Sequence, residues 1–292
     1  MIENVQLDIA DNSNVLGDGA NHGGALSEEE PVVLRSTNQT SRRQGFFKLS
    51  EKDVQIIITR KEITNHIIGA AHCVLHKQFP DAVGLENTTL GLCSNFSVHK
   101  KEFSQILHTS THHWVLVSNI GCKPSTINLY DSLCYGRLTS FVKKQIAGLL
   151  LEQSPSITVN IQPVQQQSNS VDCGVFAIAF LVSILFNQDP TCHTFNLGGM
   201  RQHLLKCLHQ DVFEPFPMAK QQVQWKSKPK SVKLPLMCSC RMPWNQKDLD
   251  NPDLWCAQCE SCSQWFHKKC SPTMPDAVFQ IKDVHWVCLK CE

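Results

Sequence analysis

Apolar residues recur along this chain with two different periods, which predict helices in some segments and strands in others. Between Ile63 and Phe79 they return at every third or fourth position, as on one face of an amphipathic helix. Thr64 or Asn65 could cap the start of this helix, and Pro80 would end it. The same period predicts two further helices, at 140–153 and around 199–213.

Short apolar runs with a strand-like pattern predict β-strands at 113–119, 126–133 and 156–164. The first two are joined through the sequence GCKPS, in which Gly and Pro suit a turn. One helix, then strands, then a core helix is an order that does not repeat a regular βαβ unit. We therefore expect a mixed α+β domain.

The segment from Gln165 to Phe186 changes character abruptly at Cys173. The residues before it are polar, whereas those from Gly174 to Phe186 are apolar except for Ser183. This run is shorter than the ~20 residues that a membrane span requires, and it has the length of a helix buried in a protein core. We expect no membrane partner.

A cysteine at the first turn of a buried helix lies beside unpaired backbone N–H groups and the positive end of the helix dipole. Both favour the thiolate, which is the nucleophilic form of cysteine. Cys173 is therefore a candidate nucleophile. The alternative is a buried structural cysteine.

Composition separates the C-terminal end from the rest of the chain. The 27 basic and 26 acidic residues nearly balance, so net charge indicates no polyanionic partner. Of the 15 cysteines, eight lie in the last 55 residues. The N-terminus has no basic start followed by an apolar core, so no signal peptide is expected, and clustered cysteines then favour metal binding over disulfides.

Two segments are expected to lie outside any folded domain. Residues 1–45 are rich in Asn, Ser, Gly and Glu without a sustained period, which predicts disorder. Residues 217–235 include five lysines and no acidic residue between 220 and 233, which predicts a solvated linker. Direct nucleic-acid binding through this basic linker stays open as an alternative.

A cysteine nucleophile requires a base, a group that orients the base, and an oxyanion donor. His113 and Asp131 lie on two predicted strands, and an antiparallel turn would return them to the same end of a sheet. Gln167 lies in the polar loop before Cys173, from which its amide could reach a developing oxyanion. His112 competes with His113 for the role of the base, Asp131 could simply cap a turn, and Gln167 belongs to a glutamine-rich loop.

In combination, three short strings in this order resemble the ubiquitin-like-protein proteases, the SUMO-protease family related to the adenovirus protease. They are HW (113–114), YDSL (130–133) and QSNSVDCG (167–174). The resemblance covers residues 46–216, and the stretch that begins HIIGAAHC is similar to transposon-associated members, which suggests derivation from a mobile element. It implies a papain-like (adenain-like) fold with Cys173 as nucleophile, His113 as base, Asp131 orienting it and Gln167 in the oxyanion hole.

The resemblance also implies hydrolysis of a peptide or isopeptide bond after the C-terminal glycine of a modifier such as SUMO, NEDD8 or ubiquitin, or of its conjugates. Trp114 matches one of two tryptophans that hold the glycine tail in this family, so it is a candidate substrate-binding residue. The other usually opens a Trp-Leu-Asn-Asp motif, and the aligned stretch here reads EITN, with Glu62 in its place. An acyltransferase with the same triad and an idle protease-fold scaffold are the alternatives.

The C-terminal end carries four close pairs of metal-ligating residues. They are Cys238 with Cys240, Cys259 with Cys262, His267 with Cys270, and Cys288 with Cys291. Eight ligands fill two tetrahedral sites, the arrangement that structural zinc prefers. Too few residues lie between the pairs for a hydrophobic core, so two structural Zn²⁺ ions would supply most of the folding energy. Cys256 is left over.

The string WFH at 265–267 and Trp286 two residues before Cys288 resemble a PHD finger, with a RING domain as the alternative. The resemblance implies a small cross-brace zinc finger over residues 236–292. One ion would be held by Cys238, Cys240, His267 and Cys270, and the other by Cys259, Cys262, Cys288 and Cys291. Trp265 and Trp244 match positions of a methyl-lysine cage, which implies a histone-tail partner.

These inferences combine into one expectation, that of a cysteine protease in the nucleus which a PHD finger brings to histone tails. Its catalytic domain is expected at 46–216. A scaffold that acts only through the finger is the alternative.

Overall fold

The computed structural model describes residues 49–93, 95–133, 138–150, 156–219, 228–236, 238, 240, 251–280 and 285–292. The chain divides into two units, 1–43 and 44–292, and only the second contains described residues. The predicted disordered segment, 1–45, therefore lies outside the described residues.

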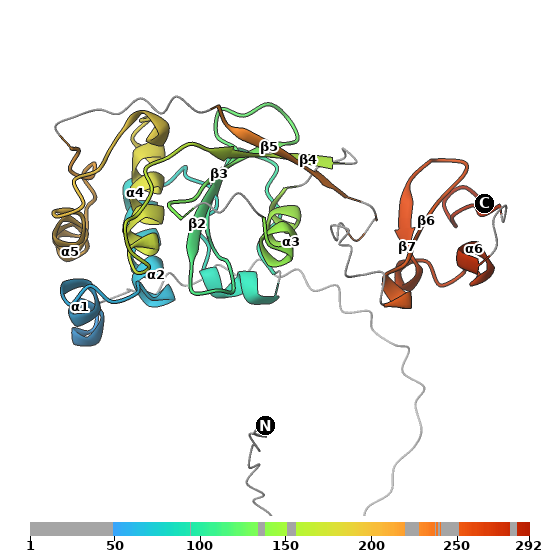
Figure 1. Ribbon diagram of the computed structural model, residues 1–292, viewed down its shortest axis with the longest axis horizontal. Helices are drawn as coiled ribbons and strands as arrows, with labels where there is room; N and C mark the ends of the chain where they lie inside the picture. Colours follow the sequence, from blue (N-terminus) through green and yellow to red (C-terminus); the bar gives the residue numbers. More distant parts are fainter. Residues whose placement is uncertain are drawn as a thin grey trace, which may run out of the picture. The chain divides into compact units, whose positions relative to one another are not determined.

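A mixed five-stranded sheet, in the order β1-β2-β3-β4-β5, forms the centre of the larger unit (Figure 1). The β3–β4 pair is parallel, and the other three pairs are antiparallel. The strands are β1 (Ser104–His108), β2 (Trp114–Ser118), β3 (Thr126–Tyr130), β4 (Ser156–Gln162) and β5 (Lys230–Pro235).

Helices cover both faces of this sheet, with α2, α4 and α5 on one side and α3 on the other (Figure 1). Successive residues of a strand point to opposite faces, so Trp114 and Leu116 pack in the α4 layer while Val115 and Val117 pack in the α3 layer. The helices are α1 (Glu51–Ile58), α2 (Asn65–Gln78), α3 (Ser140–Leu149), α4 (Cys173–Leu185) and α5 (Met200–Gln210).

Helix α4 is buried along most of its length. Its residues from Cys173 to Ser183 are all buried, as its apolar sequence requires. Phe176 and Phe180 make ring contacts with Phe195, which follows the helix in the chain. Burying a side chain of this size stabilises the fold by about 1.5–3 kcal/mol, so α4 holds a fixed position relative to the sheet.

The ends of the helices follow from local chemistry. The Thr64 side chain accepts a hydrogen bond from the backbone N–H of Ile67 at the start of α2, and Ser50 and Asp53 form a capping box at the start of α1. The helix predicted from Ile63 to Phe79 is observed as Asn65–Gln78.

The predicted α+β class is confirmed, and the α+β domain is followed by a small cysteine-rich region with two candidate metal sites. The prediction of a solvated linker over 217–235 is wrong for Lys230–Pro235. These residues form β5 and pair with β4 along its length. Val232 and Leu234 pack into the α3 layer, which is why a lysine-rich segment is ordered here.

The cysteine-rich region contains little regular structure. A two-stranded antiparallel sheet joins β6 (Cys256–Gln258) to β7 (Trp265–His267). Its other elements are η4 (Pro252–Leu254), η5 (Lys268–Cys270) and α6 (Ala277–Gln280). Its small core contains three of the candidate metal ligands, Cys238, Cys259 and Cys288, beside Phe266 and Trp286. A fourth candidate ligand, His267, is buried as well.

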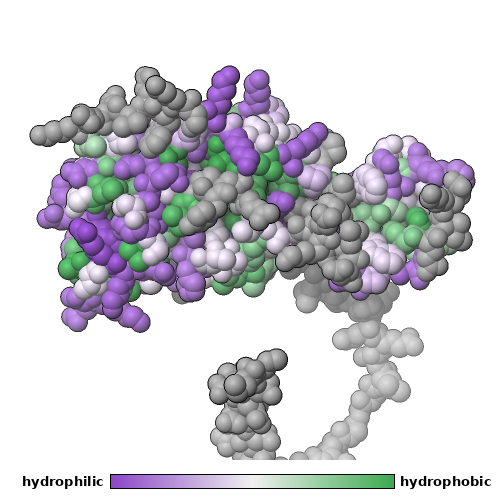
Figure 2. All heavy atoms as spheres, viewed as in Figure 1, coloured by the Kyte–Doolittle hydropathy of each residue, from purple (hydrophilic) through white to green (hydrophobic). Residues whose placement is uncertain are grey.

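On the face of the molecule in Figure 2, hydrophilic residues are interspersed with smaller apolar areas. None of the described helices combines the length and the hydropathy needed to cross a bilayer.

Candidate active site and metal sites

The candidate nucleophile is the first residue of α4. Cys173 is only 1% exposed, and its thiol donates a long hydrogen bond of 3.9 Å to the carbonyl oxygen of His112. The burial of α4 fixes the backbone at Cys173. The first turn of α4 therefore presents its N–H groups beside the sulfur.

His113 and Asp131 lie at the same end of the sheet, as the antiparallel pairing of β2 and β3 requires. His113 directly precedes β2 and Asp131 directly follows β3, and Leu116 pairs with Tyr130 between them. His113 Nε2 and Asp131 Oδ1 are 2.7 Å apart. A carboxylate at this distance fixes the ring orientation and leaves Nδ1 to act on the thiol.

The electrostatics of His113 favour its cationic form. Burial of the ring opposes the charge, but the hydrogen bond to Asp131 and the neighbouring Cys173 outweigh it and raise the pKa of His113 to about 9. The Nδ1 atom is buried and makes no hydrogen bond of good geometry within the described residues. The structure thus places the His113 imidazole next to both the Cys173 sulfur and the Asp131 carboxylate.

His112, the competing histidine, is placed differently. Its side chain is 85% exposed, and its Nδ1 lies 3.5 Å from Glu62 Oε2. Its backbone, with a φ of 53°, places its carbonyl oxygen toward Cys173. The ring of His113, by contrast, lies beside both Asp131 and Cys173.

Gln167 is buried, and both ends of its side-chain amide are held. Its Oε1 accepts a hydrogen bond of 2.6 Å from the Ser132 hydroxyl, and its Nε2 donates to the carbonyl oxygen of Asn169 at 2.5 Å. One N–H of the amide remains to serve as a donor. The oxyanion role of Gln167 stays a prediction. Ser132, which sets the orientation of this amide, gave no signal in the sequence beyond lying next to Asp131.

Trp114 closes one side of the site through a contact with the segment before α2. Its indole N–H donates to the carbonyl oxygen of Ile63 at 2.8 Å. Ile63 in turn lies so close to Gly174 that a Cβ at that position would be 2.6 Å from the Cβ of Ile63. Only glycine permits this approach, so the segment that contains Glu62 is held beside the nucleophile.

A cavity of about 470 Å³ lies beside this contact. Trp114 and Ile63 line it together with the exposed residues Glu62 and His112, and apolar area predominates in its wall. Because His112 and Ile63 also contact Cys173 and Gly174, the cavity lies next to the first turn of α4.

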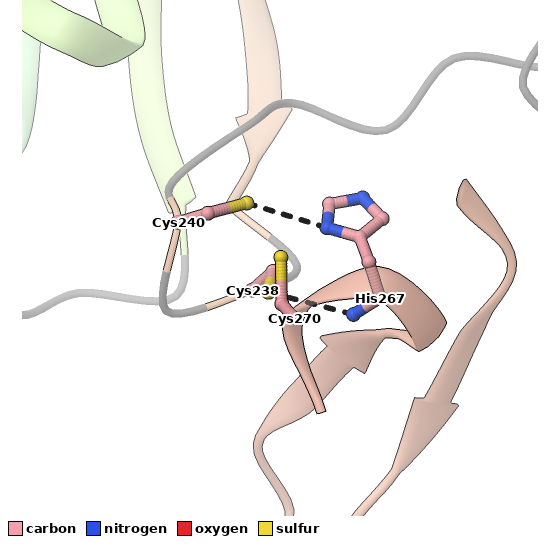
Figure 3. Close-up of side chains that lie close together, drawn as sticks. All are labelled: Cys238, Cys240, His267 and Cys270. Carbon is pink, nitrogen blue, oxygen red and sulfur yellow. Dashed lines mark hydrogen bonds between the residues drawn. The ribbon is translucent and has the colours of Figure 1, made fainter. Parts of the chain in front are cut away.

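The eight predicted metal ligands gather in two groups of four. In each group the ligand atoms all lie within 4.8 Å of one another. One group is Cys238, Cys240, His267 and Cys270 (Figure 3), and the other is Cys259, Cys262, Cys288 and Cys291. The pairs alternate along the chain between the two groups, which is a cross-brace arrangement.

The separations between ligand atoms fit a tetrahedral ion. With Zn–S bonds of about 2.3 Å, two sulfurs of one tetrahedron are about 3.8 Å apart. The Sγ atoms of Cys262 and Cys288 are 3.9 Å apart, and His267 Nδ1 lies 3.3 Å from Cys240 Sγ. Backbone N–H groups of His267 and Cys288 also point at the sulfurs of Cys238 and Cys259, as they do toward thiolates. Both groups could therefore hold a metal ion.

Of the other residues singled out in this region, the structure describes Trp265 and Cys256. Trp265 is 37% exposed on β7, so its indole is available to a ligand. Trp244 lies outside the described residues. Cys256 pairs with His267 across β6 and β7 and joins neither group of ligands.

Residues 94–214 match the model of the Ulp1 protease family, C-terminal catalytic domain. This segment contains Cys173, His113, Asp131 and Gln167. Among curated proteins, none matches the chain.

Several solved structures are similar in fold. One is the SUMO protease Ulp1 with its catalytic cysteine oxidised to a sulfenic acid, at 17% identity, covering 56% of this chain and 85% of that one, with a TM-score of 0.44. Another is the C-terminal Ulp1 protease domain in complex with Smt3, the yeast ortholog of SUMO, at 17% identity, covering 55% and 82%, with a TM-score of 0.42. A third is a de-sumoylating protease, at 13% identity, covering 56% and 86%, with a TM-score of 0.39.

The raised pKa of His113 leads to a pH-dependent stability. The pKa of His113 is about 9 in the folded protein and 6.5 in an ordinary histidine, so protonated His113 stabilises the folded state. This contribution to the free energy of unfolding is complete below pH 6.5 and is lost as the pH rises through about 9. In Asp131→Asn we expect the His113 pKa to fall by about one to three units. The difference in unfolding free energy between wild type and variant should be largest near pH 6 and vanish above pH 9.

Urea denaturation at a series of pH values measures this difference. Asp81→Asn, which neutralises an exposed carboxylate, serves as the control and should show no such trend. A gap that stays constant from pH 6 to pH 10 would contradict the His113–Asp131 ion pair.

The two ligand groups predict a metal-dependent fold for the C-terminal region. Elemental analysis should find about two zinc ions per chain, and a chelator should make residues 251–292 sensitive to protease, because the metal would supply most of their folding energy. Cys288→Ala should retain one ion, whereas Cys93→Ser, at an exposed cysteine outside both groups, should retain two. Unchanged protease resistance after complete metal removal would contradict this prediction.

Proposed function

We propose that the chain is a cysteine protease that hydrolyses a peptide or isopeptide bond after the C-terminal glycine of a ubiquitin-like modifier. The observation that carries the proposal is the placement of His113 between Cys173 and Asp131, inside the segment that matches the Ulp1 catalytic family. The position of the sulfur at the first turn of α4 supports it, because the N-terminus of a helix stabilises negative charge that develops beside it.

In the proposed reaction, the Cys173 thiolate attacks the carbonyl carbon of the glycine, and His113 holds the proton taken from the thiol. The oxyanion is stabilised by backbone N–H groups at the first turn of α4 and by the amide of Gln167. His113 then gives its proton to the leaving amine, and it activates the water that hydrolyses the thioester. Asp131 keeps the ring oriented throughout and stabilises its charge.

The substrate would approach through the cavity beside Trp114. A glycine tail without side chains would suit the crowded surroundings of the buried sulfur, where Trp114 and Ile63 are in contact. Glu62 places a carboxylate in the wall of the same cavity. We propose SUMO, NEDD8 or ubiquitin, free or conjugated, as the class of partner.

For the C-terminal region we propose a PHD-type zinc finger that brings the protease to histone tails in the nucleus. Two cross-braced ligand groups and the exposed Trp265 support this proposal. A methylated lysine would be attracted to the face of the indole.

Two other functions would use the same residues differently. An acyltransferase would pass the acyl group from Cys173 to an amine rather than to water, and the product distinguishes the two. A scaffold without catalysis would not need the geometry of the triad. The 2.7 Å contact between His113 and Asp131 therefore favours an enzyme over a scaffold.

Labelling with modifier probes tests the catalytic proposal. SUMO, NEDD8 and ubiquitin that carry a C-terminal electrophile are incubated with the full chain, and at least one should form a covalent adduct at Cys173. Cys173→Ala should abolish the adduct and lower cleavage of the corresponding fusion by more than about a thousandfold.

Cys122→Ala removes a cysteine in the turn between β2 and β3 and should leave labelling intact. A protein whose Cys173 reacts with iodoacetamide but with no probe of the panel would contradict the proposed substrate class.

Titration with histone-tail peptides tests the proposed finger. A trimethyl-lysine peptide should bind more tightly than its unmethylated form, and Trp265→Ala should reduce this preference by roughly 2- to 30-fold, the range of a cation–π contact. Leu289→Ala, at another exposed apolar residue of the region, should leave it unchanged. Equal affinities for both peptides in the wild type would rule the cage out.

A further inference from the structure

Arg201 of α5 is an arginine buried beneath the loop that leads to Cys173. Its side chain is 9% exposed. Nε donates to Asp172 Oδ1 at 2.7 Å, Nη2 to the carbonyl oxygen of Val171 at 2.9 Å, and Nη1 to the carbonyl oxygen of Ile56 in α1 at 3.4 Å. One guanidinium therefore joins α5, α1 and the residue directly before the nucleophile.

Asp172 is the N-cap residue of α4, yet its side chain does not cap the helix. Aspartate is among the most favourable N-cap residues, because its carboxylate accepts from N–H groups of the first turn. Here Oδ1 is held by Arg201, and Oδ2 accepts from Asn169 Nδ2 at 2.7 Å. The carboxylate is thus turned away from the N–H groups that it would otherwise occupy.

These N–H groups are the ones on which the chemistry at Cys173 depends. A carboxylate on them would compete with the thiolate and with the oxyanion, and its charge would disfavour a second negative charge beside it. The same hydrogen bonds extend to Gln167, because Asn169 also accepts from the Gln167 amide. A displaced Asp172 would therefore disturb both proposed parts of the oxyanion hole.

We propose that Arg201 is a positioning residue that holds the Asp172 carboxylate off the N-terminus of α4 and thereby keeps the first turn free for negative charge at Cys173. The proposal rests on the proposed protease function. Its test uses a reagent that needs no substrate, so its failure is distinguishable from a failure to process any modifier.

Several other charged or titratable side chains surround the sulfur and must be unchanged in the test. His113, which directly precedes β2, lies beside the sulfur with Asp131 on its other side. Glu62 and His112 form a more exposed pair at the adjoining cavity. Arg201 and Asp172 are the third pair, and they are the pair varied.

The experiment measures the rate of alkylation of Cys173 by iodoacetamide from pH 4 to pH 10 in the full chain, with the Cys173 peptide quantified by mass spectrometry. In Arg201→Met, the pH midpoint of alkylation should rise by about one unit, because the released carboxylate lies beside the thiolate. Below the midpoint this amounts to a roughly tenfold slower reaction.

Adding Asp172→Ala tests whether the Asp172 carboxylate causes the rise in the midpoint. In Arg201→Met with Asp172→Ala, no carboxylate remains to reach the helix, so the midpoint should return to within about 0.3 units of the wild type. Arg201→Lys keeps the charge without the planar fork and should give a smaller rise. Lys206→Met removes an exposed cation of the same helix, which pairs with Glu214, and should change nothing.

Two results would overturn the proposal. An Arg201→Met protein that alkylates like the wild type while unfolding at lower urea would make the arginine purely structural. A double variant that keeps the raised midpoint would show that Asp172 is not the intermediary. If Arg201→Met does not fold, the Arg201→Lys protein decides, and an unchanged midpoint there overturns the proposal as well.

Discussion

The site depends on the tight packing of the helix that carries the candidate nucleophile. Helix α4 is buried from Cys173 to Ser183, and the contact of Ile63 with Gly174 fixes its first turn against the segment before α2. The position of the sulfur is therefore set by packing rather than by a flexible loop. The sheet then brings the imidazole and carboxylate to it, because β2 and β3 are antiparallel and end side by side. A change in this packing would separate groups that only work when they are within hydrogen-bond reach.

The sequence pattern predicts the parts of this arrangement that are local. The apolar run after Cys173 indicates a buried helix, and the turn between the two strands indicates that His113 and Asp131 return to one end. The spacing of the metal ligands predicts four close pairs for two sites, the resemblance to a PHD finger implies how these pairs are grouped, and the observed groups have the same members.

Other parts could not be predicted because they depend on distant segments. β5 is a lysine-rich stretch with few apolar residues, and these residues are buried only because β5 pairs with β4. Its composition alone therefore predicted a linker. The amide of Gln167 is oriented by Ser132, 35 positions away in the chain. Arg201 in an amphipathic helix is indistinguishable from a solvated arginine until its three acceptors are seen. Hydrogen bonds between residues far apart in the chain produce no periodic sequence pattern from which they could be predicted.

The segment that contains the candidate triad and the cysteine-rich region are stabilised by different means. The first packs helices on both faces of a sheet, whereas the second has a small core in which candidate metal ligands take the place of apolar side chains. Negative charge on sulfur would need neighbouring positive charge in both places. At α4 that charge would come from backbone N–H groups and from His113, and at the ligand groups it would come from a metal ion. A carboxylate free to reach the first turn of α4 would oppose negative charge on Cys173, and the buried Arg201 would prevent this by holding Asp172.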